Sequence, residues 1–369
     1  MRAEAIVDVS AIKFNVELLK KTSGTKLLAV VKADAYGHGL VPVAQAAVSA
    51  GADYLGVALL EEAVALREAG ITAPILAWLV QPGSDFSQAI SLDIDIAAAS
   101  LKALSEIAAA SRQLQKKARV HLEVDTGMTR GGFLAEWDQL DSEHVKGVEI
   151  VGIFSHFARA DEPGEKQNQD QMARFAEMVA KLEALGCTHL IKHLSNSAAT
   201  LKNNAAAFDM VRTGIAIYGL SPDVQTLGSS SALKLRPAMQ LRAALYLVKD
   251  VPAGTPVGYG ATESTKSDTR LGVITIGYAD GIPRIARGAG VWHNGKRAPI
   301  IGRVSMDQFV VDLGPDSKAQ SGDWVTIFGN GSHGEYTADD WGAASQSINY
   351  EIVTRIGPRV PRIYSPHIY

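Results

Sequence analysis

Residues 30–39 read Val-Val-Lys-Ala-Asp-Ala-Tyr-Gly-His-Gly, and the organisation of the chain follows outward from them. The apolar run Leu27 to Val31 ends abruptly at Lys32, which is typical of a strand buried on both faces. A lysine at the carboxyl end of such a strand would lie at the mouth of an α/β fold, where these folds place their chemistry. The two glycines that follow predict a release into a helix near Leu40. A desolvated amine there is a nucleophile, and the plain alternative is a lysine reaching solvent from a strand end.

The size and composition of the chain favour a globular protein of two domains. Its 369 residues exceed one typical core, and 47% of them are hydrophobic, which argues against disorder. The net charge of -3 gives no electrostatic reason to expect a nucleic-acid or membrane partner, and no apolar stretch approaches the ~20 residues of a membrane span. One cysteine, Cys187, excludes a disulfide framework, and Met1–Ser10 is not a signal peptide. We therefore expect a cytoplasmic protein.

Short apolar runs alternate with segments of helical periodicity in the amino-terminal part, after a first helix predicted to be capped by Asp8 or Ser10. The strand-like runs are Leu27–Lys32, Tyr54–Leu59, Pro74–Leu79, Ile94–Ala98, Val120–Asp125, Ile150–His156, Leu190–Ser195 and Met210–Gly214. Eight such runs, each followed by a helix or a turn, are what a closed (β/α)8 TIM barrel requires. An open doubly wound sheet is the alternative, and the first run lacks the Gly-x-Gly-x-x-Gly turn that would favour it.

The pattern changes beyond Asp223, where the Gly/Ser-rich stretch Thr226–Ser231 is predicted to be a linker. The runs that follow are Met239–Val248, Thr255–Tyr259, Leu271–Ile276, Pro299–Val304, Phe309–Leu313 and Trp324–Phe328. They are alternating or β-branched, Gly and Pro separate them, and one helix is predicted near Ala338–Ile348. We expect an α/β chain with a barrel over residues 1–228 and a mostly antiparallel β domain over residues 229–369.

Polar side chains follow the apolar runs at the points where barrel strands would end. Because the carboxyl ends of barrel strands meet on one face, these side chains are predicted to share one bowl. They are Lys32 and Tyr36 after the first run, Glu123 to Arg130 after the fifth, His156 after the sixth, His193 to Ser197 after the seventh and Arg212 to Ile215 after the eighth. A single histidine is usually structural and a single arginine usually a surface ion-pair partner, so it is their convergence that indicates a site.

A phosphate site is predicted from Ser197 and Gly214. Ser197 would begin a helix, whose free N–H groups hold anions, and Gly214 allows the backbone to approach closely. Phosphate beside a strand-tip lysine indicates pyridoxal phosphate, bound to Lys32 as a Schiff base. His156 could lie on its pyridine ring, and Arg212 could donate to the ring nitrogen. A metal site is disfavoured, because the histidines lack a spaced carboxylate or cysteine set.

Longer motifs extend this pattern along the chain. They are Val31 to Gly39, Val124 to Arg130, His193 to Ser197, Arg212 to Gly219, Gly258-Tyr-Gly260, Gly277 to Gly281, Gly302 to Gln308 and Arg359 to Arg362. As a set, in this order, they resemble the alanine racemase family, pyridoxal phosphate enzymes of fold type III with a barrel and a β domain. The resemblance covers nearly the whole chain, and it is the set of motifs, not any single one, that is specific.

The resemblance implies that two bases move the α-proton of an amino acid. Lys32 would hold the cofactor and act as one base, and Tyr259 of the partner subunit would act on the opposite face. A homodimer with shared active sites follows, and the product D-alanine would supply cell-wall synthesis. Without the resemblance, Tyr259 would be interpreted as a tyrosine in a turn.

The resemblance also assigns supporting roles. The cofactor contacts are implied to be Lys32, Tyr36, Arg130, His156, Asn196, Ser197, Arg212, Gly214 and Ile215. The substrate carboxylate is implied to bind Arg130 and the Met306 backbone. Residues that support the site or line the substrate access route are implied to be His193, Tyr278, Asp307, Asp161, Arg284, Arg303, Ile356 and Glu123.

Two positions depart from the family pattern. Glu123 stands where many members carry a carbamylated lysine that orients the arginine, and its shorter stem predicts contact with Arg130 through water or a small anion. Activity would then be independent of bicarbonate. Pro358 stands where many members carry a tyrosine that contacts the phosphate, and proline cannot donate that bond.

Alternative functions remain at this point. A racemase of broader specificity, acting also on serine or larger side chains, is the nearest alternative, and the volume of the pocket would decide it. A pyridoxal phosphate carrier without turnover would consist of the barrel alone, which the second domain with Tyr259 and Met306 argues against. An amino-acid decarboxylase shares the barrel, but its usual substrate is larger and basic.

Overall fold

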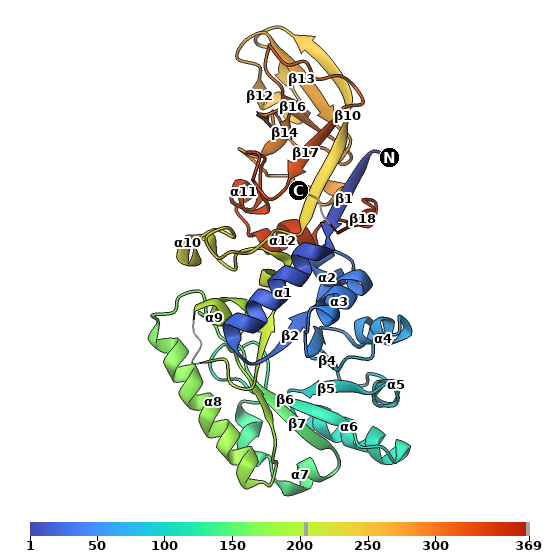
Figure 1. Ribbon diagram of the computed structural model, residues 1–369, viewed down its shortest axis with the longest axis vertical. Coiled ribbons are helices and arrows are strands. Elements are labelled where there is room, and N and C mark those ends of the chain that lie inside the picture. The colour runs from blue at the N-terminus through green and yellow to red at the C-terminus, as the bar shows by residue number, and fades with distance from the viewer. Residues whose placement is uncertain (203–205, 367–369) are drawn as a thin grey trace. The chain divides into compact units, whose positions relative to one another are not determined.

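The computed structural model describes residues 1–202 and 206–366, whose path is shown in Figure 1. Contacts between Cα atoms divide the chain into two compact units. The barrel unit comprises Ile12–Ala35 and Leu40–Leu235, and the sheet unit comprises Met1–Ala11, Tyr36–Gly39 and Arg236–Tyr369. In the described residues, no helix combines the length and the apolar character needed to cross a membrane.

The barrel unit is built on eight parallel strands, as the apolar runs predict. They are β2 (Lys26–Val30), β3 (Tyr54–Val57), β4 (Ile75–Ala77), β5 (Ile94–Ala98), β6 (Arg119–Glu123), β7 (Glu149–Phe154), β8 (Ile191–His193) and β9 (Met210–Thr213). Their hydrogen-bonded order is β8-β7-β6-β5-β4-β3-β2-β9. The Asp209 N–H donates to Lys192 O at 3.0 Å and the Arg212 N–H to Ser195 O at 2.9 Å, which nearly closes the ring. The predicted TIM barrel is confirmed, and the open doubly wound sheet is excluded.

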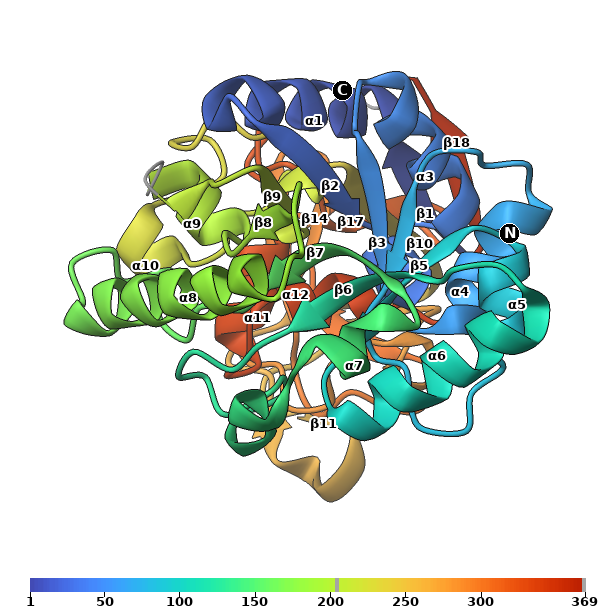
Figure 2. The same cartoon turned by 90° about the horizontal axis from the view of Figure 1, so that it is seen from below.

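Helices surround these strands, as the end-on view in Figure 2 shows. They are α1 (Val9–Ser23), α3 (Leu40–Ser49), α4 (Leu60–Glu68), α5 (Phe86–Ser91), α6 (Leu101–Leu114), α7 (Ser142–Lys146), α8 (Lys166–Ala184), α9 (Ser197–Lys202) and α10 (Val224–Leu227). α1 begins as predicted, because Asp8 Oδ1 accepts from the N–H groups of Ser10 and Ala11 at 2.8 and 3.0 Å. Leu27, Leu28 and Ala29 of β2 are fully buried, which confirms a strand covered on both faces.

The sheet unit is mostly antiparallel, as predicted. Its main sheet contains β1 (Ala3–Asp8), β10 (Met239–Val251), β13 (Thr269–Ile274), β14 (Gly290–His293), β15 (Lys296–Pro299), β16 (Phe309–Asp312), β17 (Trp324–Phe328) and β18 (Arg362–Ser365). A separate hairpin joins β11 (Pro256–Val257) to β12 (Glu263–Ser264). The described ladders are antiparallel apart from β1 with β18. The pairing of β1 with β10 brings the amino terminus into this sheet.

Two predicted elements of the sheet unit differ from the structure. The run Pro299–Val304 is not a strand, because β15 ends at Pro299 and Gly302 turns the chain with φ +76° against the Val257 carbonyl. The predicted helix near Ala338–Ile348 is α11 (Ala338–Ala344), and a separate helix α12 (Asn349–Thr354) follows it.

The stretch Thr226–Ser231 is a folded part of the barrel unit, so the predicted linker is wrong. Ser221 N–H donates to Ser230 Oγ at 3.0 Å, and Ser221 Oγ donates to Gly228 O at 2.7 Å. Because these polar groups are paired and Ser230 is buried, the composition marks a compact turn and not a flexible connection.

Candidate active site

Lys32 begins a helical turn of the left hand at the tip of β2. In α2 (Lys32–Gly37), residues 33–36 have φ between +52° and +54°, and Gly37 has φ +77°. This conformation costs an L-residue about 1–2 kcal/mol, and it persists only where its surroundings hold it, most often at functional sites. The glycines predicted a release into α3, which is confirmed, but nothing in Ala-Asp-Ala-Tyr predicts the left-handed turn.

Glu62, from the first turn of α4, holds the start of this left-handed turn. Its Oε1 accepts from the Ala33 N–H at 2.6 Å, and its Oε2 accepts from the N–H groups of Ala58 and Leu59 at 3.0 and 3.1 Å. One carboxylate therefore ties the residue after Lys32 to the junction of β3 and α4. The sequence prediction missed Glu62. The only signal for it in the sequence is its position shortly after a predicted strand.

Three influences set the charge of Lys32. Burial and the positive charge of Arg130 lower the pKa of its amine, whereas the negative charge of Glu62 raises it, and the net shift is downward. A lowered pKa increases the fraction of neutral amine, which is the form that attacks a carbonyl. The structure thus places an amine of lowered pKa at the strand tip where the sequence predicts a nucleophile.

Arg212, at the carboxyl end of β9, is a buried cation surrounded by neutral acceptors. Its Nη1 donates to His193 O at 2.6 Å and contacts His193 Nδ1 at 3.2 Å, and its Nη2 donates to Ser155 O at 2.6 Å. Its guanidinium also lies over the Phe154 ring, 5.3 Å from the centroid. Burial lowers the pKa of Arg212 to about 10, so it remains protonated at neutral pH. The predicted support of Arg212 by His193 agrees with this geometry.

His156 lies beside Arg212 and is neutral over the physiological range. Its Nδ1 is 3.3 Å from Arg212 Nη2. Burial, together with the charges of Arg212, Arg130 and Lys32, lowers the pKa of His156 to about 3. Gln171 of α8 donates to the His156 carbonyl at 2.9 Å, which fixes this strand tip. A neutral imidazole with this environment is suited to packing on a ring and not to carrying a proton.

Ser197 lies where α9 and a short 3-10 helix, η3 (Ile215–Tyr218), begin. Its Oγ accepts from the N–H groups of Gly214 and Ala216 at 3.0 and 3.4 Å. Asn196 caps α9, because its Oδ1 accepts from the Ala199 N–H at 3.1 Å. The predicted start of a helix at Ser197 is confirmed, and a hydroxyl and backbone N–H groups meet there as an anion site requires.

Glu123 ends β6 near the loop that carries Arg130. A Cβ on Gly131 would lie 3.3 Å from Glu123 Oε1, which places the carboxylate next to that loop. Burial raises the pKa of Glu123, and the charges of Arg212 and Arg130 oppose the shift. The loop is held by Asp125, whose Oδ1 accepts from the N–H groups of residues 127–129 at 2.9 to 3.2 Å.

The sheet unit presents a second group of predicted residues on its surface. Tyr259 is 70% exposed at the tip of a turn in which Gly258 and Gly260 have φ of +72° and +77°. The segment 302–307, which we call the methionine loop, packs at one end against Gly258 and at the other accepts from the Tyr278 N–H through Ser305 O at 3.1 Å. Met306, in this loop, is 54% exposed. Arg359 Nη2 donates to Asp307 at 2.6 Å.

The predicted residues fall into two sets, one in each unit. The barrel unit holds Lys32, Glu123, Arg130, His156, Asp161, His193, Asn196, Ser197, Arg212, Gly214 and Ile215. The sheet unit holds Tyr36, Tyr259, Tyr278, Arg284, Arg303, Met306, Asp307, Ile356 and Pro358. Burial raises the pKa of Tyr36 to about 12, and its ring is tilted against Tyr350 with centroids 6.2 Å apart.

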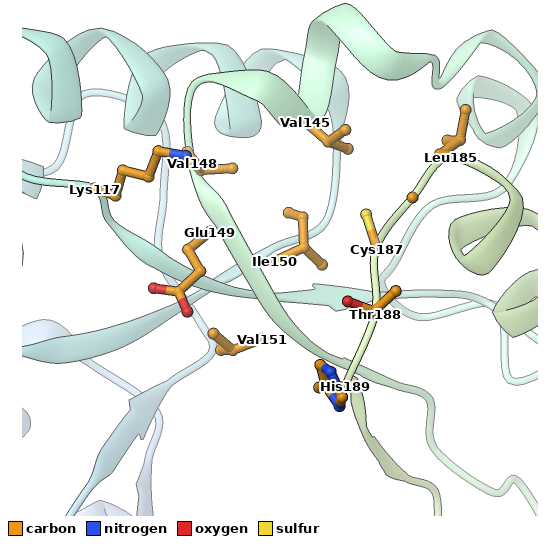
Figure 3. Close-up of a pocket in the computed structure, with 11 residues that line it drawn as sticks. Lys117, Val145, Val148, Glu149, Ile150, Val151, Leu185, Cys187, Thr188 and His189 are labelled. Carbon is orange, nitrogen blue, oxygen red and sulfur yellow. The ribbon is translucent and has the colours of Figure 1, made fainter.

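A hollow of about 410 Å³ also opens at the amino ends of β6 and β7 (Figure 3). Its lining includes Lys117, Glu149, Cys187 and His189. These residues lie before their strands or at the strand starts, at the end of the barrel opposite to Lys32. Barrel enzymes carry out their chemistry at the carboxyl ends of the strands, so the candidate site is the Lys32 face and not this hollow.

The fold and the site define a (β/α)8 barrel with a partly buried lysine at a strand tip, followed by a β domain. Family models described as the alanine racemase N-terminal and C-terminal domains match residues 7–222 and 238–364. The alanine racemase of Salinispora arenicola is 49% identical over 371 residues, covering 98% of each chain. Solved alanine racemases from Streptomyces lavendulae and Corynebacterium glutamicum align with TM-scores of 0.97 and 0.86, at 47% and 34% identity. The first covers 100% of this chain and 98% of its own, the second 99% of each.

The chain belongs to the alanine racemase family, whose members interconvert L-alanine and D-alanine. The match covers both units, so the resemblance drawn from the sequence motifs is confirmed. The carrier and decarboxylase interpretations are accordingly set aside.

Proposed function

We propose that this enzyme racemises alanine with pyridoxal phosphate bound to Lys32, and that Tyr259 of a second copy supplies the opposite base. The observation that carries the proposal is the amine of Lys32, whose pKa is lowered and which shares its surroundings with neutral His156 and buried Arg212. Family membership supports the activity, and the residue roles are our inference.

The donor set of the barrel tip fits pyridoxal phosphate. An amine is available for the aldehyde, and a buried guanidinium held by neutral acceptors is available for the ring nitrogen. Ser197 Oγ accepts from the N–H groups of Gly214 and Ala216, so its hydroxyl proton is left to donate to a phosphate, with Tyr36 as a further donor. When bound, this cofactor supplies an electron-withdrawing ring that acidifies the α-proton of an amino acid.

Each barrel residue then has a distinct task. Arg212 stays protonated, so it would donate to the ring nitrogen without giving up its proton and would moderate the electron withdrawal that the cofactor supplies. Neutral His156 would pack against the ring and help to exclude water from it. Arg130, whose loop is fixed by Asp125, binds the substrate carboxylate together with the Met306 backbone of the second copy. Lys32 Nζ removes or returns the α-proton on one face.

The exposed surface of the sheet unit supports a homodimer. Tyr259 and Met306 are large side chains that remain exposed on the sheet unit, which is typical of a surface that a partner covers. In the dimer that we propose, Tyr259 Oη faces Lys32 Nζ of the other copy across the substrate. Asp161, Arg284, Arg303 and Ile356 line the access route, and Tyr278 and Asp307 support the methionine loop.

We further propose alanine as the preferred substrate and D-alanine for cell-wall synthesis as the role of the product. Acceptance of serine or larger side chains is the alternative, and a panel of L-amino acids with chiral product analysis decides between them. A cytoplasmic location stays a prediction from the sequence.

The proposal is tested by trapping the bond at Lys32. After reconstitution with pyridoxal phosphate and reduction with borohydride, peptide mass spectrometry is expected to find the cofactor mass on Lys32. The variant Lys32→Ala should lose both this adduct and the racemisation of L-alanine. A wild-type enzyme that racemises L-alanine while Lys32 remains unmodified would contradict the proposal.

A further inference from the structure

A chain of buried polar side chains crosses the barrel from β5 to β9. Asp95 Oδ2 is 3.4 Å from His121 Nε2, His121 Nδ1 is 2.9 Å from His193 Nε2, and His193 Nδ1 is 3.2 Å from Arg212 Nη1. Asp95 is 2% exposed, Arg212 is 7% exposed, and the two imidazoles are fully buried. Only the last two members, His193 and Arg212, belong to the site described above.

The two ends of this chain have fixed hydrogen-bonding character. Arg212 is a guanidinium, so it only donates. At the other end, Arg119 donates from Nε to Asp95 Oδ1 at 2.8 Å and from Nη2 to Oδ2 at 3.3 Å. Burial alone would raise the pKa of Asp95, but the hydrogen bonds from His121 and Arg119 outweigh it and lower the pKa. Asp95 is therefore a carboxylate that only accepts.

These two ends determine where both imidazole protons lie. Because Arg212 only donates, His193 Nδ1 must accept, which leaves the His193 proton on Nε2. That proton is donated to His121 Nδ1, so His121 carries its own proton on Nε2 and donates it to Asp95. A doubly protonated His121 would force the His193 proton onto Nδ1, where it would face the Arg212 donor. Hydrogen bonds thus run in one direction, from Arg212 to Asp95.

The surrounding packing keeps the two rings in line. A Cβ on Gly152 of β7 would overlap the His121 ring, so the absence of a side chain at that position makes room for the imidazole. The His193 ring stacks on Phe154 with centroids 5.0 Å apart and planes at 15°. The same Phe154 ring lies under the Arg212 guanidinium. These neighbours leave each ring one orientation in which its nitrogens meet both partners.

We propose that Asp95 and His121 are positioning residues of this racemase, which act through His193 to hold the Arg212 guanidinium at the strand tips. The consequence for catalysis rests on the proposed role of Arg212 toward the cofactor ring. The proton positions do not depend on it, because they follow from the side chains alone. Three strands lie between the strand of Asp95 and that of Arg212 in the hydrogen-bonded order, and Asp95 still selects the tautomer that Arg212 meets.

The substitution Asp95→Asn should reverse the whole chain. The asparagine oxygen takes the Oδ1 position and faces Arg119 Nε, the nearest donor, and the NH2 group takes the Oδ2 position and donates to His121 Nε2. Arg119 Nη2 and the Tyr54 hydroxyl then lose Oδ2 as an acceptor, and Nη2 keeps its bond to the Tyr54 oxygen. His121 then accepts at Nε2 and carries its proton on Nδ1, and His193 is forced to carry its proton on Nδ1, facing Arg212. Glu149→Gln is the matched control, because Glu149 is 4.0 Å from Arg119 Nη1 but has no contact with the imidazole chain.

The test is imidazole NMR of the holoenzyme with 15N-labelled histidine, assigned through His121→Gln and His193→Gln. In the wild type and in Glu149→Gln, His121 and His193 are both expected as neutral Nε2–H tautomers. In Asp95→Asn, both histidines should become Nδ1–H tautomers. We also expect kcat for L-alanine to fall about tenfold or more, because the His193 Nδ1–H and the Arg212 guanidinium, both donors, would then face each other in place of a hydrogen bond. Glu149→Gln should keep its kcat within about twofold of the wild type.

Several results would overturn the proposal. A wild-type spectrum with either histidine as Nδ1–H or doubly protonated refutes it without any variant, so it stays testable if Asp95→Asn does not fold. Unchanged tautomers in folded Asp95→Asn refute it too, and so does a full tautomer reversal with unchanged kcat. Failure to trap cofactor on Lys32 would refute the proposed function instead, and the tautomer signals would still be as expected.

Discussion

Burial and two neighbouring charges together determine how readily the Lys32 amine loses its proton. Burial and Arg130 lower its pKa, and Glu62 limits the shift while its carboxylate also holds the Ala33 N–H. Glu62 therefore has two separable effects at this site, one on charge and one on backbone position. A glutamine of the same shape removes the charge and keeps one acceptor oxygen, and its NH2 group replaces the other oxygen, which also accepts from backbone N–H groups.

We predict that Glu62→Gln lowers the pKa of Lys32 further. Because Glu62 raises this pKa, its removal leaves burial and Arg130 unopposed, so the neutral amine appears at lower pH. The measurement is the pH dependence of Lys32 acylation in cofactor-free protein, followed by peptide mass spectrometry. The midpoint should move to lower pH in Glu62→Gln and stay in place in Glu61→Gln, the exposed neighbour in the same turn. A midpoint that moves upward, or moves equally in both variants, would contradict the assignment.

Glu123 leads to a second prediction at the scale of single residues. Its carboxylate provides a negative charge without carbamylation, so we expect kcat in carbon-dioxide-free buffer to match kcat after bicarbonate is added. Glu123→Gln removes a negative charge that attracts the Arg130 and Arg212 guanidinium groups. We expect KM for alanine to rise, because this carboxylate then no longer orients Arg130. Activity that vanishes without carbon dioxide and returns with bicarbonate would show that the idea is wrong.

At the scale of elements, the left-handed turn α2 sets where the Lys32 side chain starts. Five successive residues have positive φ, and four of them are not glycine, so the chain turns with the left hand directly after β2. Asp34 Oδ1 accepts from the Leu40 N–H at 2.8 Å and so ties the turn to the start of α3. The conformational cost is offset by such bonds and by burial of Ala35.

We predict that Ala33→Gly leaves the free energy of unfolding unchanged or raises it by up to about 1 kcal/mol. Glycine removes the left-handed strain, which is similar in size to the backbone entropy that it adds to the unfolded chain. Ala109→Gly is the control, since Ala109 is also exposed but lies inside the right-handed helix α6. It should lose about 1 kcal/mol in urea unfolding. Equal losses in the two variants would show that Ala33 is not strained.

The sequence predicts those elements that depend on residues near one another in the chain, and it does not predict contacts between distant segments. The eight barrel strands were predictable, because each apolar run, such as Leu27 to Val31, records burial on both faces. The start of α9 was predicted at Ser197 itself, and the structure adds the cap on this helix, Asn196. The pairing of β1 with β10 could not be predicted, because the two strands lie far apart in the chain. Asp95 and His121 were missed for the same reason, since their roles depend on cross-barrel contacts.

At the scale of the whole molecule, the predicted catalytic residues are divided between two units. Lys32 belongs to the barrel unit, and Tyr259 belongs to the sheet unit, on a turn that leaves its ring 70% exposed. In the proposed dimer each barrel receives the tyrosine of the other copy. This arrangement makes every active site dependent on two chains, so it can be separated experimentally from a site within one chain.

Subunit mixing tests most directly whether Lys32 of one copy acts together with Tyr259 of the other. Lys32→Ala and Tyr259→Phe homodimers are each expected to be inactive. After the two are mixed and re-associated, half of the dimers are mixed, and each of these has one site with both residues intact, so about a quarter of the wild-type activity per chain should return. If mass spectrometry shows mixed dimers and activity stays at the level of the parent variants, Lys32 and Tyr259 do not act across the dimer, and the account is wrong.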